Sequence, residues 1–133
     1  MTDDIDLLGM YLHLARASDF RRRPHVRDRF YVLAAAVATR SGLPRIAGAC
    51  RTRVLEHNGN HVLRNWPTMA DAMRAVDFQP VLRLLERRYP RERAEQLLDK
   101  LGLDLANERA AYFTDEEYAA ALLGLPLIDG ELS

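Results

Sequence analysis

The chain has 133 residues, of which 48% are hydrophobic and 29% charged, and its formal net charge is zero. This length allows one domain with a core of its own, so neither disulfides nor a structural metal is needed for stability. The single cysteine, Cys50, excludes an internal disulfide and gives no indication of secretion.

Targeting and membrane segments are not recognisable in the sequence. The chain opens with Asp3, Asp4 and Asp6, where a signal peptide would have basic and then apolar residues. The longest unbroken apolar run covers the nine residues 30–38. A membrane helix needs about 20 such residues. We therefore expect a cytoplasmic protein that does not interact with a membrane.

The charges are distributed unevenly along the chain. Residues 1–66 hold 11 arginines against six acidic residues, a net charge of +5. Residues 67–133 hold eight basic against 13 acidic residues, a net charge of −5. This asymmetry predicts either an acidic partner for the first half or pairing between the halves, within the fold or between subunits.

Apolar spacing and the positions of glycine and proline predict an all-α bundle of six to seven short helices. The first helix is expected over about 4–18. Pro24 suits the first position of the next helix, about 24–39, where its missing N–H is no loss. The middle of this helix is apolar on all sides, so we expect it to be the central helix of the bundle. Gly42 is expected to end it in the left-handed conformation.

Helix signals continue through the middle of the chain. Pro44 is expected to open a third helix, which Gly59 ends. A short helix is predicted from its cap Thr68 to Val76, and Asp77 is expected to cap the helix that follows. Trp66 is predicted to pack over the nearby helix start, in the core, and not to form a ligand platform.

The last two helices have clear boundaries. Pro90 restarts the chain as a helix that is expected to end at Gly102. The capping box that starts at Thr114 predicts a final helix ending at Gly124. We expect residues 1–126 to form a single helical domain and residues 127–133 to form a disordered tail.

Residues 57–61, with the sequence HNGNH, are the most unusual stretch of the chain. His57 and His61 are four residues apart, and Cys50 lies two helical turns before His57. On an unbroken helix these three side chains would share one face and could bind zinc. Gly59 between two asparagines favours a helix end and a turn instead.

We therefore predict that this stretch is a capped helix end. Gly59 is expected to have a positive φ, and Asn60 is expected to cap the next turn. Two alternatives remain. The first is a metal site made of Cys50, His57 and His61. The second is a polar site made of His57, Asn58, Asn60 and His61.

A second candidate site is a group of arginines around Pro24. Three of them lead directly into a helix amino terminus, where unpaired N–H groups and the helix dipole favour an anion. This cluster predicts a site for phosphate, nucleic acid or an acidic peptide. The alternative is a solvated charged loop that pairs with Asp19, Asp28 and the acidic half of the chain. The five candidate residues are Arg21, Arg22, Arg23, Arg27 and Arg29.

Catalytic and cofactor motifs are not apparent. There is no glycine-rich phosphate loop, no Gly-x-Ser-x-Gly and no His-Glu-x-x-His, and we expect no cofactor. The sequence therefore favours a non-enzymatic interaction or regulatory module that binds a protein partner or a second copy of itself. The alternative function is nucleic-acid or phosphate binding through the five arginines.

Overall fold

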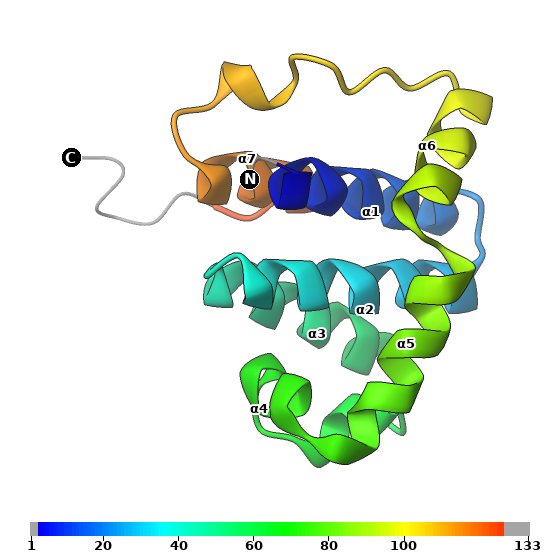
Figure 1. The fold of residues 1–133 in the computed structure, drawn as a ribbon, viewed down its shortest axis with the longest axis vertical. Coiled ribbons are helices and arrows are strands. Elements are labelled where there is room, and N and C mark those ends of the chain that lie inside the picture. The colour runs from blue at the N-terminus through cyan, green and yellow to red at the C-terminus, as the bar shows by residue number, and fades with distance from the viewer. Residues whose placement is uncertain (1–2, 127–133) are drawn as a thin grey trace.

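Residues 3–126, the part of the chain that our computed structural model describes, form α-helices and short 3-10 segments without a strand (Figure 1). The predicted all-α class is confirmed. The predicted disordered tail, 127–133, lies outside the described residues. The α-helices are α1 (Asp3–Phe20), α2 (Pro24–Arg40), α3 (Pro44–His57), α4 (Met69–Arg74), α5 (Gln79–Arg88), α6 (Arg91–Lys100) and α7 (Asp115–Leu123). The 3-10 segments are Val62–Asn65, Val76–Phe78 and Arg109–Ala111.

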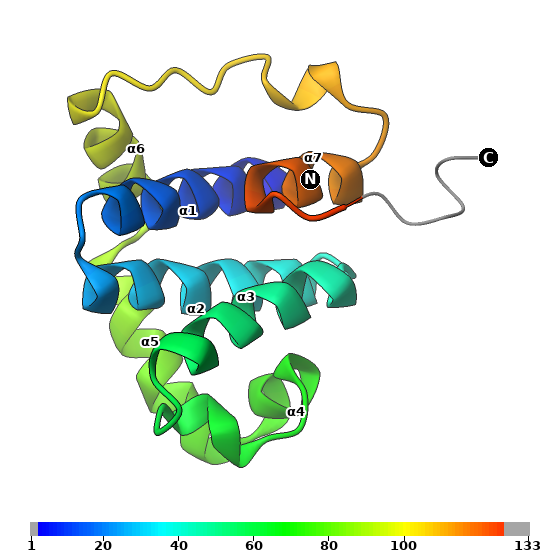
Figure 2. The same ribbon diagram turned by 180° about the vertical axis from the view of Figure 1, so that it is seen from behind.

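Helix α2 is central to the bundle, as predicted. It packs against α1, α3, α4 and α5, and every residue from 30 to 38 is buried. Figures 1 and 2 show α1 and α2 side by side in opposite directions, with α3 next to α2, α7 next to α1, and α5 and α6 crossing one end. An apolar surface on all sides of α2 fits this position, because neighbouring helices cover it on several sides.

Most of the predicted helix boundaries are confirmed. Pro24 and Pro44 lie in the first turns of α2 and α3. Gly42 has a φ of 73° just after α2, the left-handed conformation that a glycine adopts without strain. The hydroxyl oxygens of Thr68 and Thr114 accept backbone N–H bonds at the starts of α4 and α7.

The prediction that Asp77 caps a helix is wrong, and so is the extension of α4 to Val76. Helix α4 ends at Arg74, and residues 76–78 form a 3-10 turn that leads into α5. The side-chain amide of Gln79 donates a hydrogen bond of 2.8 Å from Nε2 to the Met73 carbonyl oxygen near the end of α4. This bond satisfies a carbonyl group at the helix end, so the chain can turn before Asp77.

Trp66 is partly buried against the hydrophobic core, as predicted, but its ring contact lies further along the chain than the nearby helix start at Thr68. Its ring meets the ring of Phe78 edge-on, with 5.7 Å between the centroids, and Phe78 is fully buried. The contact joins the 3-10 segment after α3 to the start of α5, so it supports the core.

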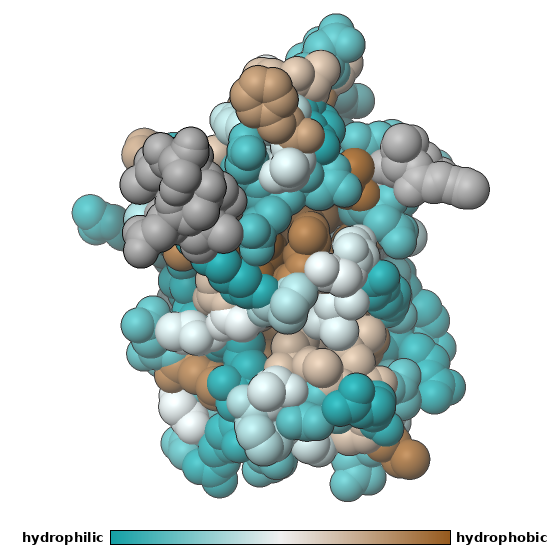
Figure 3. Space-filling model, turned by 90° about the vertical axis from the view of Figure 1, so that its left-hand side faces the viewer, coloured by the Kyte–Doolittle hydropathy of each residue, from teal (hydrophilic) through white to brown (hydrophobic). Residues whose placement is uncertain are grey.

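The surface combines hydrophilic regions with isolated apolar side chains. Figure 3 shows the end of the molecule near α7, where apolar residues appear in small patches between hydrophilic ones. Large apolar side chains at least 36% exposed in the described range are Phe20, Val76, Leu84, Leu103 and Phe113. In the same range, no helix combines the length and the apolar character that crossing a membrane requires.

Candidate functional site

The 57–61 stretch is a helix end followed by a turn. Helix α3 ends at His57, and the side-chain oxygen of Asn58 accepts the N–H of Asn60 at 3.1 Å. The cap of the next segment is His61, whose Nδ1 accepts the N–H of Leu63 at 3.1 Å. The prediction that Asn60 caps this turn is therefore wrong. The imidazole nitrogen of His61 reaches the Leu63 N–H because His61 lies directly before the 3-10 segment.

The predicted positive φ of Gly59 is also wrong. The positive-φ glycines of residues 3–126 are Gly42, Gly102 and Gly124. The helix ends without a left-handed residue because Asn58 adopts an extended conformation, with φ −134° and ψ 91°. A Cβ added at Gly59 would meet only the Leu55 carbonyl oxygen, at 3.9 Å.

Gly59→Ala is therefore expected to change the free energy of unfolding by less than about 0.5 kcal/mol, as an unstrained surface substitution does. Gly42→Ala is the matched control, because there the new side chain would sit at positive φ, and it is expected to cost about 1 kcal/mol or more. Urea denaturation measures both values. Equal losses in the two variants would show that Gly59 is conformationally constrained after all.

The partner of His57 is Asp28, a buried carboxylate on α2 that lies 29 residues earlier in the chain. The Asp28 carboxylate accepts hydrogen bonds from His57 Nδ1 and, at 3.2 Å, from Arg27 Nη1. Because an ionised carboxylate only accepts, the His57 proton is on Nδ1. The ring of His25 meets that of His57 edge-on, with 5.6 Å between the centroids. This network joins the start of α2 to the end of α3.

Cys50 takes no part in this network. Its side chain is fully buried, and burial raises the pKa of its thiol to about 12, partly offset by the charge of Arg53. A thiol needs to lose its proton to bind a metal, so this environment disfavours it as a ligand. Within the described residues, no three His, Cys, Asp or Glu side chains gather in a way that could hold a metal ion. The metal-site alternative of Cys50, His57 and His61 therefore has no support from the fold.

Burial lowers the pKa of His61, and the charge of Asp28 opposes this shift. The unfolded chain therefore takes up a proton at this histidine more readily than the folded chain does. The stability that His61 contributes is complete at neutral pH and is lost as the pH falls below the ordinary histidine value of about 6.5. Protonation at Nδ1 would also remove the acceptor for the Leu63 N–H.

We expect the melting temperature to fall more between pH 7.5 and 5 in the native protein than in a His61→Asn variant. Asparagine keeps a side-chain acceptor at the cap but does not titrate. The comparison between the two proteins separates His61 from the other histidines. An identical fall in both would contradict this assignment.

The fold separates the five candidate arginines. The Arg27 side chain, only 16% exposed, forms ion pairs with Asp19 at 3.3 Å and with Asp28 at 3.2 Å, and it lies over the Tyr31 ring. The predicted pairing of this cluster with Asp19 and Asp28 is therefore present at Arg27. Arg21, Arg22 and Arg23 are exposed in the turn between α1 and α2.

Two members of this turn line a pocket of about 390 Å³ together with residues from the second half of the chain. In Figures 1 and 2 the α1–α2 turn lies at the same edge of the molecule as α6 and the end of α5. Five cationic side chains line the pocket, and no carboxylate is found among its described lining residues. We call it the basic pocket. Its cations are Arg21, Arg23, Arg88, Arg93 and Lys100.

The floor of the basic pocket is buried, apolar and ordered by contacts. Phe30 stacks obliquely on Tyr89, with 4.6 Å between the ring centroids. The hydroxyl of Tyr11 donates a 2.5 Å hydrogen bond to the Tyr89 carbonyl oxygen, and burial raises the pKa of Tyr11 to about 12. The walls around this floor are half-buried and consist of Ala17, Val26, Leu97 and Leu101.

Sequence reasoning did not find Arg88, Arg93 and Lys100. The sequence signal for a second group of cations was the run RRYPRER over 87–93, which contains four arginines. Its relation to the α1–α2 turn depends on the packing of α1 against α6, which joins segments far apart in the chain.

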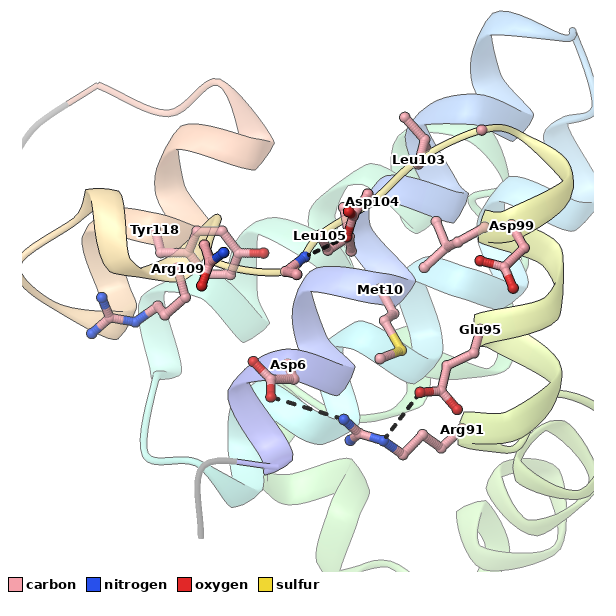
Figure 4. A pocket seen from close by; sticks show the side chains of 14 residues that line it. Asp6, Met10, Arg91, Glu95, Asp99, Leu103, Asp104, Leu105, Arg109 and Tyr118 are labelled. Carbon is pink, nitrogen blue, oxygen red and sulfur yellow. Dashed lines mark hydrogen bonds and ion pairs between the residues drawn. The ribbon is translucent and has the colours of Figure 1, made fainter.

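The opposite face of α6 lines a second, larger cavity of about 850 Å³, which we call the acidic groove (Figure 4). Figure 4 shows Asp6 and Glu95 on either side of Arg91, which forms ion pairs with them at 3.9 and 4.0 Å. The other cation of the groove, Arg109, binds Asp115 at 2.6 Å. Further carboxylates face the groove from Asp99 and Asp104. Carboxylates thus outnumber cations here, and each cation already has an acidic partner, so the groove is unsuited to an anion.

A part-buried hydrogen-bond network lies beside the acidic groove, behind its lining residue Tyr118. The hydroxyl of Tyr118 donates a hydrogen bond of 2.8 Å to Glu108, whose same oxygen lies 2.8 Å from His13 Nε2. Burial raises the pKa of Tyr118, and the bond to Glu108 and the negative charge of Glu108 raise it further. Gly9 allows the close approach of this tyrosine, because a Cβ there would lie 2.3 Å from the hydroxyl oxygen.

Comparison of the chain with protein-family models, with curated proteins and with solved structures finds no match.

Proposed function

We propose that this protein is a non-enzymatic binding module that takes up an anionic group of its ligand in the basic pocket. One observation carries the proposal: cations from the α1–α2 turn, the end of α5 and α6 converge on one hollow, and no carboxylate is found among its described lining residues. A cleft lined by one sign of charge concentrates the opposite charge. The guanidinium group adds paired donors that match phosphate and carboxylate oxygens.

A compact anion fits this arrangement better than a nucleic-acid backbone does. Nucleic-acid binding surfaces usually present cations in a stripe along one face. Here only Arg21 and Arg23 of the five predicted arginines reach the pocket, while Arg27 is paired with acidic residues. The remaining cations come from the other half of the chain and surround a hollow.

The proposal is tested by calorimetric titration with pyrophosphate at low ionic strength. We expect saturable binding that weakens as salt is added, because counterions compete for the cations. In an Arg23→Gln/Arg88→Gln variant, affinity is expected to fall at least about tenfold, since two charge-assisted contacts are lost. Arg22→Gln/Arg87→Gln is the matched control: it removes the same charge from neighbouring positions that do not line the pocket.

An equal loss of affinity in the two variants would assign the binding to overall charge and contradict the pocket. A gel shift with mixed DNA and RNA at low salt completes the test. Binding to nucleic acid that depends on Arg22 or Arg29 would favour the nucleic-acid function instead.

A protein partner or a second copy is the second candidate, and one observation favours it. Phe20 is 89% exposed and directly precedes Arg21 at the rim of the pocket, so an apolar partner surface could contact it. Light scattering after size exclusion tests self-association, which a Phe20→Ser variant is expected to weaken. The cytoplasm remains the proposed location, in keeping with the unpaired and buried Cys50.

A further inference from the structure

We infer that the ligand of the basic pocket is an amphiphilic anion, in which one phosphate or carboxylate head is joined to a single apolar chain. The head lies among the cations at the rim and the chain lies on the floor. The inference rests on the proposed anion-binding function and names the chemistry of the ligand.

The polarity of the pocket changes with depth, and this gradient carries the inference. The five cationic residues are exposed at the rim. Below them lie half-buried apolar side chains, among them Val26 and Leu97, and below these lie buried Leu14 and Phe30. A molecule that occupies the whole pocket must therefore be anionic at one end and apolar at the other.

A hydrophilic anion would leave the floor without a partner. The hydroxyl of Ser18 already donates to the Leu14 carbonyl oxygen at 2.8 Å, and the Tyr89 carbonyl oxygen already accepts from Tyr11. A sugar or a second polar group placed on the floor would lose water and find no free donor in these two groups, only their remaining acceptor lone pairs, which costs free energy. An alkyl or aryl chain would instead gain free energy from leaving water there.

The size of the pocket favours one chain over two. Its volume of about 390 Å³ is near the lower end of the roughly 300–1,000 Å³ usual for small-molecule sites. Inorganic phosphate would fill only the rim, whereas a lipid with two long acyl chains would extend far beyond the walls.

The experiment is a calorimetric titration with inorganic phosphate and with butyl, hexyl and octyl phosphate, each below its micelle concentration. Burial of one methylene group is worth about 0.8 kcal/mol, so affinity is expected to rise roughly three- to fourfold for each carbon added until the floor is covered. Hexanoate and octanoate test the carboxylate head in the same way.

A variant that narrows the pocket from its wall tests where the chain lies. Ala17 is half-buried on the pocket wall, and Ala17→Leu is expected to remove the dependence on chain length while inorganic phosphate still binds. Ala121→Leu, at an exposed site on α7, is the matched control. Leu97→Gln makes the wall polar without adding bulk, and it supports the same test if Ala17→Leu does not fold, as judged by circular dichroism.

The outcomes separate this inference from the proposed function. Phosphate binding through the pocket without any chain-length dependence would overturn the inference and leave the proposed function standing. Lack of binding by every anion, pyrophosphate included, would overturn both. A third test is co-sedimentation of the protein with anionic phospholipid vesicles in the presence of free octyl phosphate. If octyl phosphate does not reduce the amount of protein bound to the vesicles, the cations bind a membrane surface and the inference is overturned.

Discussion

Replacing Asp28 by alanine is expected to lower the free energy of unfolding by about 3–5 kcal/mol, the usual loss when one partner of a buried charge pair is removed. The Asp28 side chain is 8% exposed and accepts hydrogen bonds from both Arg27 and His57. Its removal leaves a guanidinium group that is 16% exposed without this partner, and it removes the hydrogen bond that His57, at the end of α3, makes to α2. Urea denaturation followed by circular dichroism measures the loss.

Asp19→Ala is the matched control for this variant. Asp19 forms an ion pair with the same arginine at 3.3 Å, but its side chain is 66% exposed. An exposed pair of this kind contributes about 0–1 kcal/mol. Similar losses at Asp19 and Asp28 would show that burial of the carboxylate does not matter, and they would contradict the role given to the Asp28 network.

The second large effect is expected in the middle of α2. Leu33 is 1% exposed, and Leu33→Ala is expected to lower the free energy of unfolding by about 2–5 kcal/mol through the cavity it leaves. Leu84→Ala is the control, because Leu84 is 61% exposed and its truncation is expected to change stability by less than about 0.5 kcal/mol. Unchanged stability of Leu33→Ala would contradict the central position of α2.

Phe30→Ala is expected to cost about 3–5 kcal/mol, like other buried aromatic truncations. Unlike Leu33, Phe30 also forms the floor of the basic pocket and contacts Tyr89. Its truncation therefore tests stability and binding together, and a ligand that reaches the floor would bind the variant more weakly.

The helices could be predicted from the sequence because their signals are local. A proline in the first turn needs no partner N–H, and a threonine hydroxyl caps a helix within three residues. These rules correctly placed the starts of α2, α3, α4 and α7 at Pro24, Pro44, Thr68 and Thr114. The position of α2 at the centre followed from its apolar surface, which is also a property of one segment.

Local rules were wrong where a second segment or a neighbouring residue decides the conformation. At Gly59 the extended Asn58 already ends the helix, so a left-handed glycine is unnecessary. At Asp77 the Gln79 side chain satisfies the end of α4 first. The bond between Asp28 and His57 could not be predicted, because it requires the packing angle of α2 on α3.

The candidate site was predictable only in part for the same reason. Arg21 and Arg23 stood out because they precede a helix start, a feature that can be read from neighbouring residues. The apolar floor and the other cations belong to elements that meet only in the folded chain. The spacing of residues within one segment gives no information about contacts between distant segments.

Helix α6 divides the charge of the molecule, with the basic pocket on one face and the acidic groove on the other. A protein whose formal net charge is zero therefore has a local dipole across a single helix. An approaching anion is attracted from one side of α6 and repelled from the other, so diffusional encounters are oriented before any contact forms. In kinetic terms, added salt should act mainly on the association rate constant, while the residence time follows the fit of the ligand to the apolar floor.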